Sequence, residues 1–298
     1  MTAEGSDREP IALAQLAHAD TAPVAFADLR VETTEDHGEP WQPNWPIGTE
    51  RRVIARDPMT GGSTSLLRFP ANYDRVEETR LLESGEAPRF EYHTCHEEIV
   101  CLEGEYVFGV PPLFDFSAKS YLNHPPYWLH PAHQRSGSGV LLLVKNSGPV
   151  DFGFCTIPHA WDGREHYLSA NEVEPSPSEA VTNLGFDDAR LRPVHEHGRS
   201  RQNVTGERLW TDQVTGWSTW RLRAPAGTVL TAANHAAPPP DAFVGDEWFV
   251  LDGEVSFDDD TLGPYGYRCD STTYPAGGGA TAATDVHVLR WTRGDQLA

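Results

Sequence analysis

The chain repeats two blocks of its sequence, in the same order, in its two halves. The first block, Asp57–Ala71, is DPMTGGSTSLLRFPA and returns at Asp212–Ala226 as DQVTGWSTWRLRAPA. The second block, Glu98–Glu105, is EIVCLEGE and returns at Glu247–Glu254 as EWFVLDGE. Chance similarity does not preserve order and spacing across several blocks, so we infer that the protein is a duplicated domain.

Each copy has the character of a β domain. Asp57-Pro58 and Thr60-Gly61-Gly62 supply turn chemistry between two β-rich runs, which predicts a hairpin over residues 51–72. The chain of 298 residues holds 26 Gly and 24 Pro, which favours frequent turns and few helices. We therefore predict an all-β fold, as a sandwich or a barrel in each copy.

The duplication sets the predicted domain boundaries. A polar lead-in covers residues 1–21, the first copy covers 22–157 and the second copy covers 206–298. Residues 158–205 contain Pro, Ser, Asp, Glu and His without a clear period, and we predict that they form a linker.

The charge and the cysteines limit the partners and the compartment. A formal net charge of -21 and a pI of about 4.9 repel phosphate backbones, so we do not expect nucleic acid as a partner. There is no run of about 18 apolar residues to cross a membrane, and the acidic N-terminus is unlike a secretory signal. The four cysteines have no disulfide-like or CxxC spacing, which favours a cytoplasmic location.

The segment Phe90–Gly104, FEYHTCHEEIVCLEG, concentrates the residues that could carry chemistry. If it forms one strand and a turn, then Glu91, His93, Cys95 and Glu97 share one face. Burying these groups in a barrel is costly without a counter-ion, and imidazole with carboxylate suits Fe, Mn, Zn or Ni. The alternative is an edge strand whose polar face lies in water. For Cys95, the alternative is a small buried thiol.

The same segment resembles the first motif of the cupin superfamily. That motif is His-x-His, three or four residues, Glu, six residues, Gly. The chain has Glu91-x-His93, three residues, Glu97, six residues and Gly104, so a glutamate stands where the first histidine is usual.

A second stretch, Pro125–His130, resembles the second cupin motif, Pro-x-Gly-x-x-His, with Tyr127 in the glycine place. With the preceding hairpin, the sequence is most similar to the ChrR-like branch, which includes the acetylacetone-cleaving type of dioxygenase. The resemblance implies two tandem double-stranded β-helix (jelly-roll) barrels, and homodimers are common for such barrels.

The resemblance also implies that His93, Glu97 and His130 bind a divalent metal. Two histidines and one carboxylate with open positions are the ligands of non-haem Fe(II) oxygenases, so Fe(II) is favoured over Mn, Zn or Ni. Glu91 is then either a fourth ligand or a general base.

Three further histidines lie close to these positions in the sequence. His96 is off-phase for the ligand face and His133 follows His130 by three residues, so each is expected to be a neighbour of the site. A bulge could bring His96 into the ligand set, and His96 could also move protons beside Glu91. We expect His124 to be a loop histidine.

The second copy lacks the imidazoles of the first. The counterparts of Glu91, His93, Glu97 and His130 are Pro240, Ala242, Asp246 and Ala280. A single carboxylate does not hold a transition metal, although His235 could reach in from the preceding strand. We expect the second barrel to be degenerate, metal-free and structural.

Aromatic residues near the two motifs are candidates for substrate binding. They are Tyr92, Tyr106, Tyr127 and Trp128, and barrel packing is the alternative for each.

Three functions fit these observations. The preferred one, which comes from the resemblance, is a metal-dependent dioxygenase that uses O₂ to cleave or oxidise a small chelating carbonyl or phenolic compound. The second is an isomerase, cyclase, decarboxylase or hydrolase that uses the metal as a Lewis acid. The third is a ligand-binding or sensory cupin without turnover.

Overall fold

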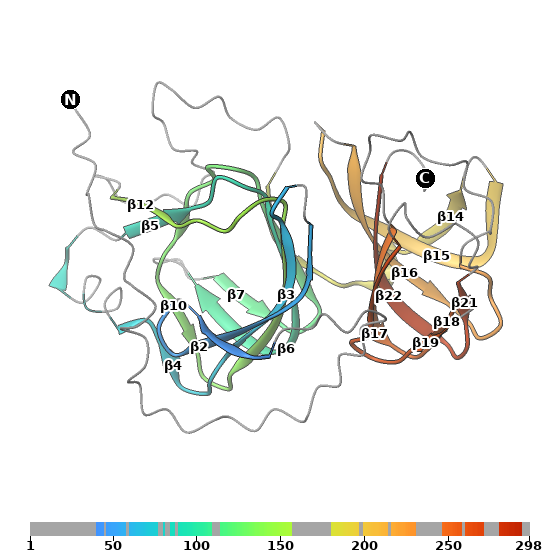
Figure 1. Ribbon diagram of the computed structural model, residues 1–298, viewed down its shortest axis with the longest axis horizontal. Coiled ribbons are helices and arrows are strands. Elements are labelled where there is room, and N and C mark those ends of the chain that lie inside the picture. The colour runs from blue at the N-terminus through green and yellow to red at the C-terminus, as the bar shows by residue number, and fades with distance from the viewer. Residues whose placement is uncertain are drawn as a thin grey trace. The chain divides into compact units, whose positions relative to one another are not determined.

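The structure is a computed structural model that divides into two compact units (Figure 1). Among the described residues, the first unit ends at Gly185 and the second begins at Phe186. It describes residues 40–44, 46–57, 60–76, 80, 84–86, 89–108, 114–156, 180–196, 199–213, 216–230, 246–257, 260–270 and 280–293. The predicted lead-in, 1–21, lies outside the described residues.

The first unit is built of antiparallel strands that curl around a common interior (Figure 1). Its strands are β1 (Gln42–Asn44), β2 (Thr49–Arg56), β3 (Ser63–Phe69), β4 (Tyr73–Asp74), β5 (Arg89–Tyr92), β6 (Glu97–Phe108), β7 (Phe114–Ser117), β8 (Ser120–His124), β9 (His130–Pro131), β10 (Gln134–Ser136), β11 (Val140–Asn146), β12 (Gly153–Thr156) and β13 (Val181–Gly185). The larger sheet runs β1-β2-β3-β11-β6-β10-β4, and a smaller one runs β12-β5-β9.

The second unit repeats this plan. It contains a 3-10 helix, η2 (Asp188–Arg190), and the strands β14 (Arg192–Glu196), β15 (Arg199–Thr211), β16 (Trp217–Ala224), β17 (Asp246–Asp252), β18 (Val255–Ser256), β19 (Thr261–Leu262), β20 (Tyr267–Asp270), β21 (Thr281–Ala282) and β22 (Val286–Arg293). One sheet runs β14-β15-β16-β22-β17-β20 and the other runs β19-β18-β21. The predicted all-β class is confirmed.

The predicted linker, 158–205, contains strands where it is described. Strands β13 and β14 and the first part of β15 fall within it. Residues 157–179 lie outside the described residues, so the predicted boundaries of the linker stay a prediction.

The duplicated hairpin has the same turn in both units. Strands β2 and β3 pair through a turn in which the amide of Gly61 donates to the carbonyl of Asp57 at 2.9 Å. Strands β15 and β16 pair through a turn in which the amide of Gly216 donates to the carbonyl of Asp212, also at 2.9 Å. The local turn chemistry therefore explains why both copies of the block fold alike.

A second duplicated feature is a glycine at a strand irregularity. Gly104 and Gly253 have φ of 78° and 79°, a left-handed conformation that favours glycine. A Cβ at Gly104 would lie 2.0 Å from the carbonyl oxygen of Gly139, and one at Gly253 would lie 2.1 Å from that of Asp285. Both glycines are required by backbone geometry and by close packing.

The two barrels differ in what fills them. In the first, Ile99 of β6 lies between Leu122 of β8 and Val144 of β11. In the second unit the residue at the place of Ile99 is Trp248, and its partners on the two neighbouring strands are Arg268 and Arg290. These three paired residues form one row across the sheet. Trp248 and Arg290 are fully buried, and the guanidinium of Arg290 stacks 4.8 Å from the indole ring. Larger side chains therefore occupy this row in the second barrel.

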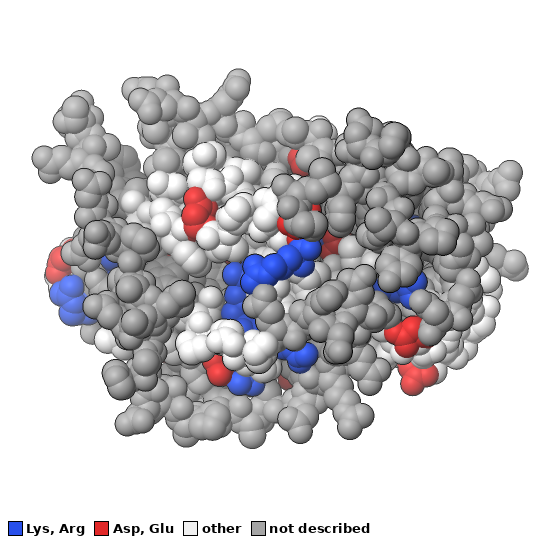
Figure 2. Space-filling model, viewed as in Figure 1, with Lys and Arg blue, Asp and Glu red and all other residues white. Residues whose placement is uncertain are grey.

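Charged groups of both signs lie on the surface. On the face that Figure 2 shows, described basic side chains form a short row near the middle, with acidic side chains around it. Within the described residues, none of the helices has the length and hydropathy needed to cross a membrane.

Candidate metal centre

The segment between β5 and β6 places the central side chains of the site. Where one continuous strand was expected over residues 90–104, the chain leaves β5 at Tyr92, bends through residues 93–96 and enters β6 at Glu97. The bend is held by the segment that follows β11. The amide of His96 donates to Ser147 Oγ at 3.0 Å, and the amide of Thr94 donates to Asp151 Oδ1 at 2.9 Å.

Strand pairing brings two acidic residues opposite two histidines. Glu97 at the start of β6 pairs with His124 at the end of β8. Glu91 in β5 pairs with His130 in β9. Residues directly opposite each other in antiparallel strands have their Cβ atoms about 4.5–5.5 Å apart, so the backbone alone gathers these four side chains.

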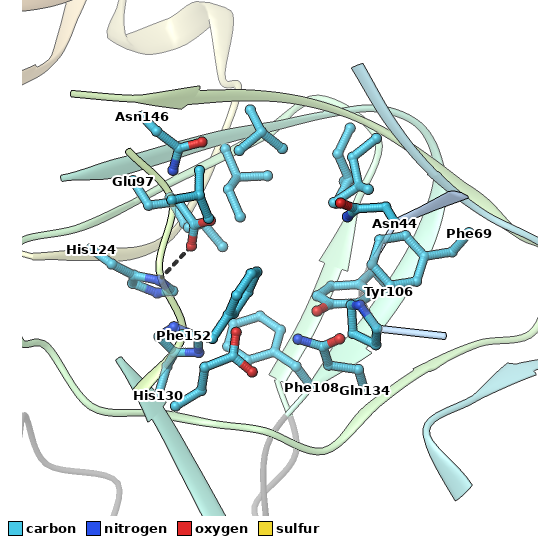
Figure 3. Close-up of a pocket in the computed structure, with 18 of the residues that line it drawn as sticks. Asn44, Phe69, Glu97, Tyr106, Phe108, His124, His130, Gln134, Asn146 and Phe152 are labelled. Atoms are coloured by element: carbon cyan, nitrogen blue, oxygen red, sulfur yellow. Dashed lines mark ion pairs between the residues drawn. The ribbon is translucent and has the colours of Figure 1, made fainter. Parts of the chain in front are cut away.

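His93 completes the cluster. Its Nε2 lies 3.5 Å from Oε2 of Glu97 and 3.6 Å from Oε1 of Glu91, and Nδ1 of His124 lies 3.6 Å from Oε2 of Glu97. The rings of His124 and His130 stack with their centroids 4.5 Å apart. Figure 3 shows Glu97, His124 and His130 on one side of the pocket, with the Glu97–His124 pair as a dashed line.

The ligand atoms form two groups compact enough to hold an ion. One is Glu91, His93 and His130, and the other is Glu97, His124 and His130, and within each group the atoms lie within 4.8 Å of one another. Bonds from transition metals to nitrogen and oxygen are about 2.0–2.2 Å, so ligand atoms on opposite sides of one ion are about 4 Å apart. Both groups fit that spacing.

Two imidazole nitrogens support a metal at this place. Within the described structure, Nδ1 of His124 and Nε2 of His130 are buried and have no hydrogen-bond partner. A buried polar atom left unpaired costs about 1–3 kcal/mol. A cation at the centre of the cluster would satisfy both lone pairs, so the residues present fit a divalent metal.

A backbone carbonyl sets the orientation of the His93 ring. Its Nδ1 lies 2.5 Å from the carbonyl oxygen of Asp151, which can only accept, so Nδ1 carries the proton. Nε2 of His93 then faces Glu91 and Glu97. This is the arrangement by which metal-binding histidines are commonly fixed.

The charges of the cluster are strongly coupled. Burial lowers the pKa of His93, but Glu97, Glu91 and the Asp151 carbonyl outweigh it and raise that pKa from 6.5 to about 10. Burial would raise the pKa of Glu97, yet His93, His124 and His130 hold it well below its usual value. Burial, His124 and His93 together lower the pKa of His130. A metal would take the place of the proton on His93.

Glu91 has a second buried partner. Arg75 Nη1 donates to Glu91 Oε2 at 2.8 Å and to the carbonyl of Ala132 at 2.7 Å. The side chains are only 7% and 4% exposed. Arg75 therefore fixes the position of the Glu91 side chain, whose other oxygen, Oε1, faces His93.

A cavity opens from the cluster into the barrel. It encloses about 700 Å³ of atom-free space, including solvent at its mouth, and its lining includes Glu91, Glu97, His124 and His130. Figure 3 shows Asn146 and Phe152 on the side of the cluster, and Asn44, Phe69, Tyr106, Phe108 and Gln134 on the opposite side. Arg51 is the one lysine or arginine among the described lining residues.

The predicted substrate-binding aromatics fall in different places. Tyr106 lines the cavity, and its burial and the nearby Glu91 raise its pKa well above 10. Tyr92, Tyr127 and Trp128 are not among the lining residues. Tyr92 alternates with Glu91 in β5 and its ring covers Gly153 in β12. Their roles in substrate binding stay predictions.

Tyr127, in the glycine place of the second motif, has a left-handed backbone. Its φ is 62°, although it is not glycine, and its amide donates to the carbonyl of His93 at 2.7 Å. A non-glycine residue with such a φ is uncommon.

The other predicted neighbours are in neither ligand group. His96 is half-buried and, like His133 and Cys95, belongs to neither ligand group nor to the described cavity lining. Its catalytic role stays a prediction. Cys95 is 7% exposed, and burial with nearby carboxylates raises its pKa to about 11, as expected of a buried thiol.

Sequence reasoning missed His124, Arg75 and Phe152. His124 is the last residue of β8 rather than a loop residue, and it shares the cavity face with Leu122. Assigning a strand to residues 120–124 would have placed His124 inward by alternation. Phe152 lines the cavity, and its ring meets His93 edge-on at 5.1 Å.

In the described part of the chain, both ligand groups lie in the first unit. Asp246 is the counterpart of Glu97 in the second unit. Its partner on the neighbouring strand is Asp270, where Glu97 has His124. Ala280, at the place of His130, is buried. Pro240, Ala242 and His235 lie outside the described residues.

Comparisons with known proteins support the fold. No family model matches the chain, and no curated protein matches it. A proposed dioxygenase from Nostoc punctiforme is 15% identical, with a TM-score of 0.54, over 84% of this chain and 76% of that chain. A variant of salicylate 1,2-dioxygenase from Pseudoaminobacter salicylatoxidans, in complex with gentisate, is 13% identical, with a TM-score of 0.52, over 85% and 76% of the two chains.

A cupin 2 conserved barrel domain protein from Leptotrichia buccalis is 11% identical, with a TM-score of 0.44, over 82% of this chain and 88% of that chain. Identities this low concern the fold alone. The two structures with TM-scores above 0.5 show that this chain shares their fold.

Proposed function

We propose that the protein is a metal-dependent cupin enzyme with one active centre, in the first unit. The observation that carries this proposal is the buried cluster at the cavity wall, in which two imidazole nitrogens have no hydrogen-bond partner within the described structure. Most buried polar atoms of folded proteins have a hydrogen-bond partner.

For the reaction we propose O₂-dependent cleavage or oxidation of a small chelating carbonyl or phenolic compound, as in the acetylacetone-cleaving type of the ChrR-like branch. The mixed nitrogen and oxygen ligands support Fe(II), with Mn, Zn or Ni as alternatives. When bound, such a metal supplies Lewis-acid polarisation and, for Fe(II), a site for oxygen chemistry.

The chain's own residues would bind and orient the substrate. Phe69, Phe108 and Phe152 give the cavity apolar walls, while Tyr106 and Gln134 offer polar atoms across from the cluster. Such a mixture suits a planar compound with a few oxygen atoms. Glu91, oriented by its bond from Arg75, is the group we assign to take a proton from the bound compound.

The location and partners belong to the same proposal. We propose a cytoplasmic homodimer that acts on a small molecule, without nucleic acid and without a membrane. Sedimentation of the purified full chain tests the dimer.

Metal analysis and oxygen uptake test the function. Full-length protein purified without chelators should contain about one Fe, Mn, Zn or Ni per chain, and Fe(II)-loaded protein should consume O₂ with a β-diketone or a catechol. Protein that contains no metal and takes up none of the four ions would refute the proposal.

One observation favours a second candidate. Glu91 is a buried carboxylate beside the cluster, which is what proton abstraction by a non-redox, metal-assisted isomerase or decarboxylase needs. Turnover of a carbonyl compound without O₂ uptake would favour it. Metal binding with no turnover of any compound would favour a ligand-binding or sensory role.

A further inference from the structure

We propose that His124 is a metal ligand and supplies the imidazole that the first motif lacks, while Glu91 stays outside the metal's ligand set. The ligands would be His93, Glu97, His124 and His130. This inference rests on the proposed metal-dependent function and specifies which residues of the chain hold the ion.

The position of His124 in the sheet supports its role. It lies directly opposite Glu97 in the pairing of β6 with β8, and its Nδ1 lies 3.6 Å from Oε2 of that residue. This separation is too long for a hydrogen bond and suits two ligands bound side by side to one ion. The side chain is about 5% exposed, so water does not readily satisfy Nδ1.

The ring of His130 lies close to the rings of both other histidines. Its ring stacks on that of His124 at 4.5 Å and lies 5.3 Å from that of His93. Nδ1 of His124 and Nε2 of His130 are both buried and make no hydrogen bond in the described structure. Three imidazoles therefore surround the place where Glu97 projects, although the first motif supplies only one of them.

The contacts of Glu91 argue for a different role. Arg75 binds its Oε2 at 2.8 Å and is itself fixed by the carbonyl of Ala132. The positive charge of Arg75 offsets the negative charge of Glu91, so this buried pair adds no net charge to the metal site. The net charge of the site is then that of the divalent ion and the single carboxylate of Glu97. Glu91 thus lies next to the ion as a pre-oriented base.

Binding of Cu(II) and Co(II) to the full-length protein, after removal of its own metal, tests the ligand assignment. Cu(II) bound to the wild type should show an electron paramagnetic resonance spectrum with three coupled nitrogens. His124→Gln should show two coupled nitrogens. Its Co(II) affinity should fall roughly 100-fold or more, which exceeds the loss typical of a residue that contacts a ligand but not the metal. Glu91→Gln should keep three nitrogens, and its Co(II) affinity should fall by less than that of His124→Gln, because the loss comes from the charge of Arg75 left unpaired near the ion.

His195→Gln, an exposed histidine of the second unit, is the matched control and should change neither quantity. Only two coupled nitrogens in the wild type would overturn the assignment, even if His124→Gln does not fold. Unchanged Co(II) binding in a folded His124→Gln would overturn it too. A loss in Glu91→Gln as large as in His124→Gln would overturn the outer role of Glu91. A wild type that binds no ion would instead refute the proposed function.

Discussion

Arg75 and Glu91 form a buried ion pair, with Nη1 of Arg75 2.8 Å from Oε2 of Glu91. Removing one partner leaves an uncompensated charge in the interior, which typically costs about 3–5 kcal/mol. We therefore expect Arg75→Met to lower the free energy of unfolding by about that amount in urea denaturation. The double variant Arg75→Met/Glu91→Gln should recover part of the loss, because no charge is then stranded.

A second pair in the same segment is the control for this prediction. Arg80 and Glu86 lie 3.5 Å apart, with side chains 62% and 56% exposed. Exposed pairs contribute about 0–1 kcal/mol, so Arg80→Met should have little effect. Equal losses in Arg75→Met and Arg80→Met would show that the Arg75–Glu91 pair is not buried in solution.

The carboxylate of Asp151 should support the metal centre without touching it. It accepts from the amide and the hydroxyl of Thr94, at 2.9 and 2.8 Å, while the backbone carbonyl of the same residue holds His93. Loss of the side-chain bonds should loosen the His93 ring. We expect Asp151→Ala to weaken Co(II) binding about 10-fold, measured by calorimetry, with the fold retained.

Asp260 is the matched control for Asp151. In the second unit it makes a similar bond, in which the amide of Thr261 donates to its Oδ1 at 2.7 Å. Asp260→Ala should leave Co(II) binding unchanged. If both variants bind Co(II) as the wild type does, the Asp151 carboxylate has no positioning role.

Much of the fold follows from local sequence signals. The duplicated blocks predicted paired barrels because turn residues such as Asp57 and Gly61 act within a few positions of one another. Gly104 was recognisable for the same reason, since its backbone conformation excludes other residues. The bend at residues 93–96 was not predictable, because Ser147 and Asp151, which hold it, are more than 50 residues away.

The site residues likewise include some that the sequence predicted and some that it did not. His93, Glu97 and His130 were named from motif spacing, and the structure brings them together with Glu91. His124 was missed because no strand was assigned to residues 120–124, so its phase was unknown. Arg75 was missed because it lies in a polar segment whose only relation to Glu91 is through space.

Gly104 should tolerate no side chain. Its φ of 78° is strained for other residues, and an added Cβ would lie 2.0 Å from the backbone oxygen of Gly139. Strained backbone costs of order 1–3 kcal/mol, and the clash adds to it. Gly104→Ala should lower the thermal unfolding midpoint markedly. Gly185→Ala, where nothing lies within 4 Å, should not, and equal midpoints would contradict the close packing.

The charge coupling at His93 predicts how the metal-free protein responds to pH. Its pKa in the folded state is about 10, against 6.5 for an ordinary histidine. The folded state therefore holds a proton that the unfolded state releases above pH 6.5. The stability from this proton is complete below pH 6.5 and is lost as the pH rises toward 10.

Near pH 6.5 the lowered pKa of His130 acts in the opposite direction, because the unfolded chain loses the proton of that histidine as the pH rises. We therefore expect the unfolding midpoint of the metal-free protein to fall between about pH 7.5 and 8.5, where the His93 proton dominates. This window avoids the buried thiols Cys95 and Cys101, whose ordinary pKa is 9.0 and which burial raises to about 11 and 12. In His93→Gln the slope should be smaller. A wild-type midpoint that does not fall in this window, or the same slope in both proteins, would show that His93 is not protonated beside Glu97. Because the metal must displace that proton, the apparent Co(II) affinity of the wild type should rise with pH over the same window, by up to about 10-fold per unit.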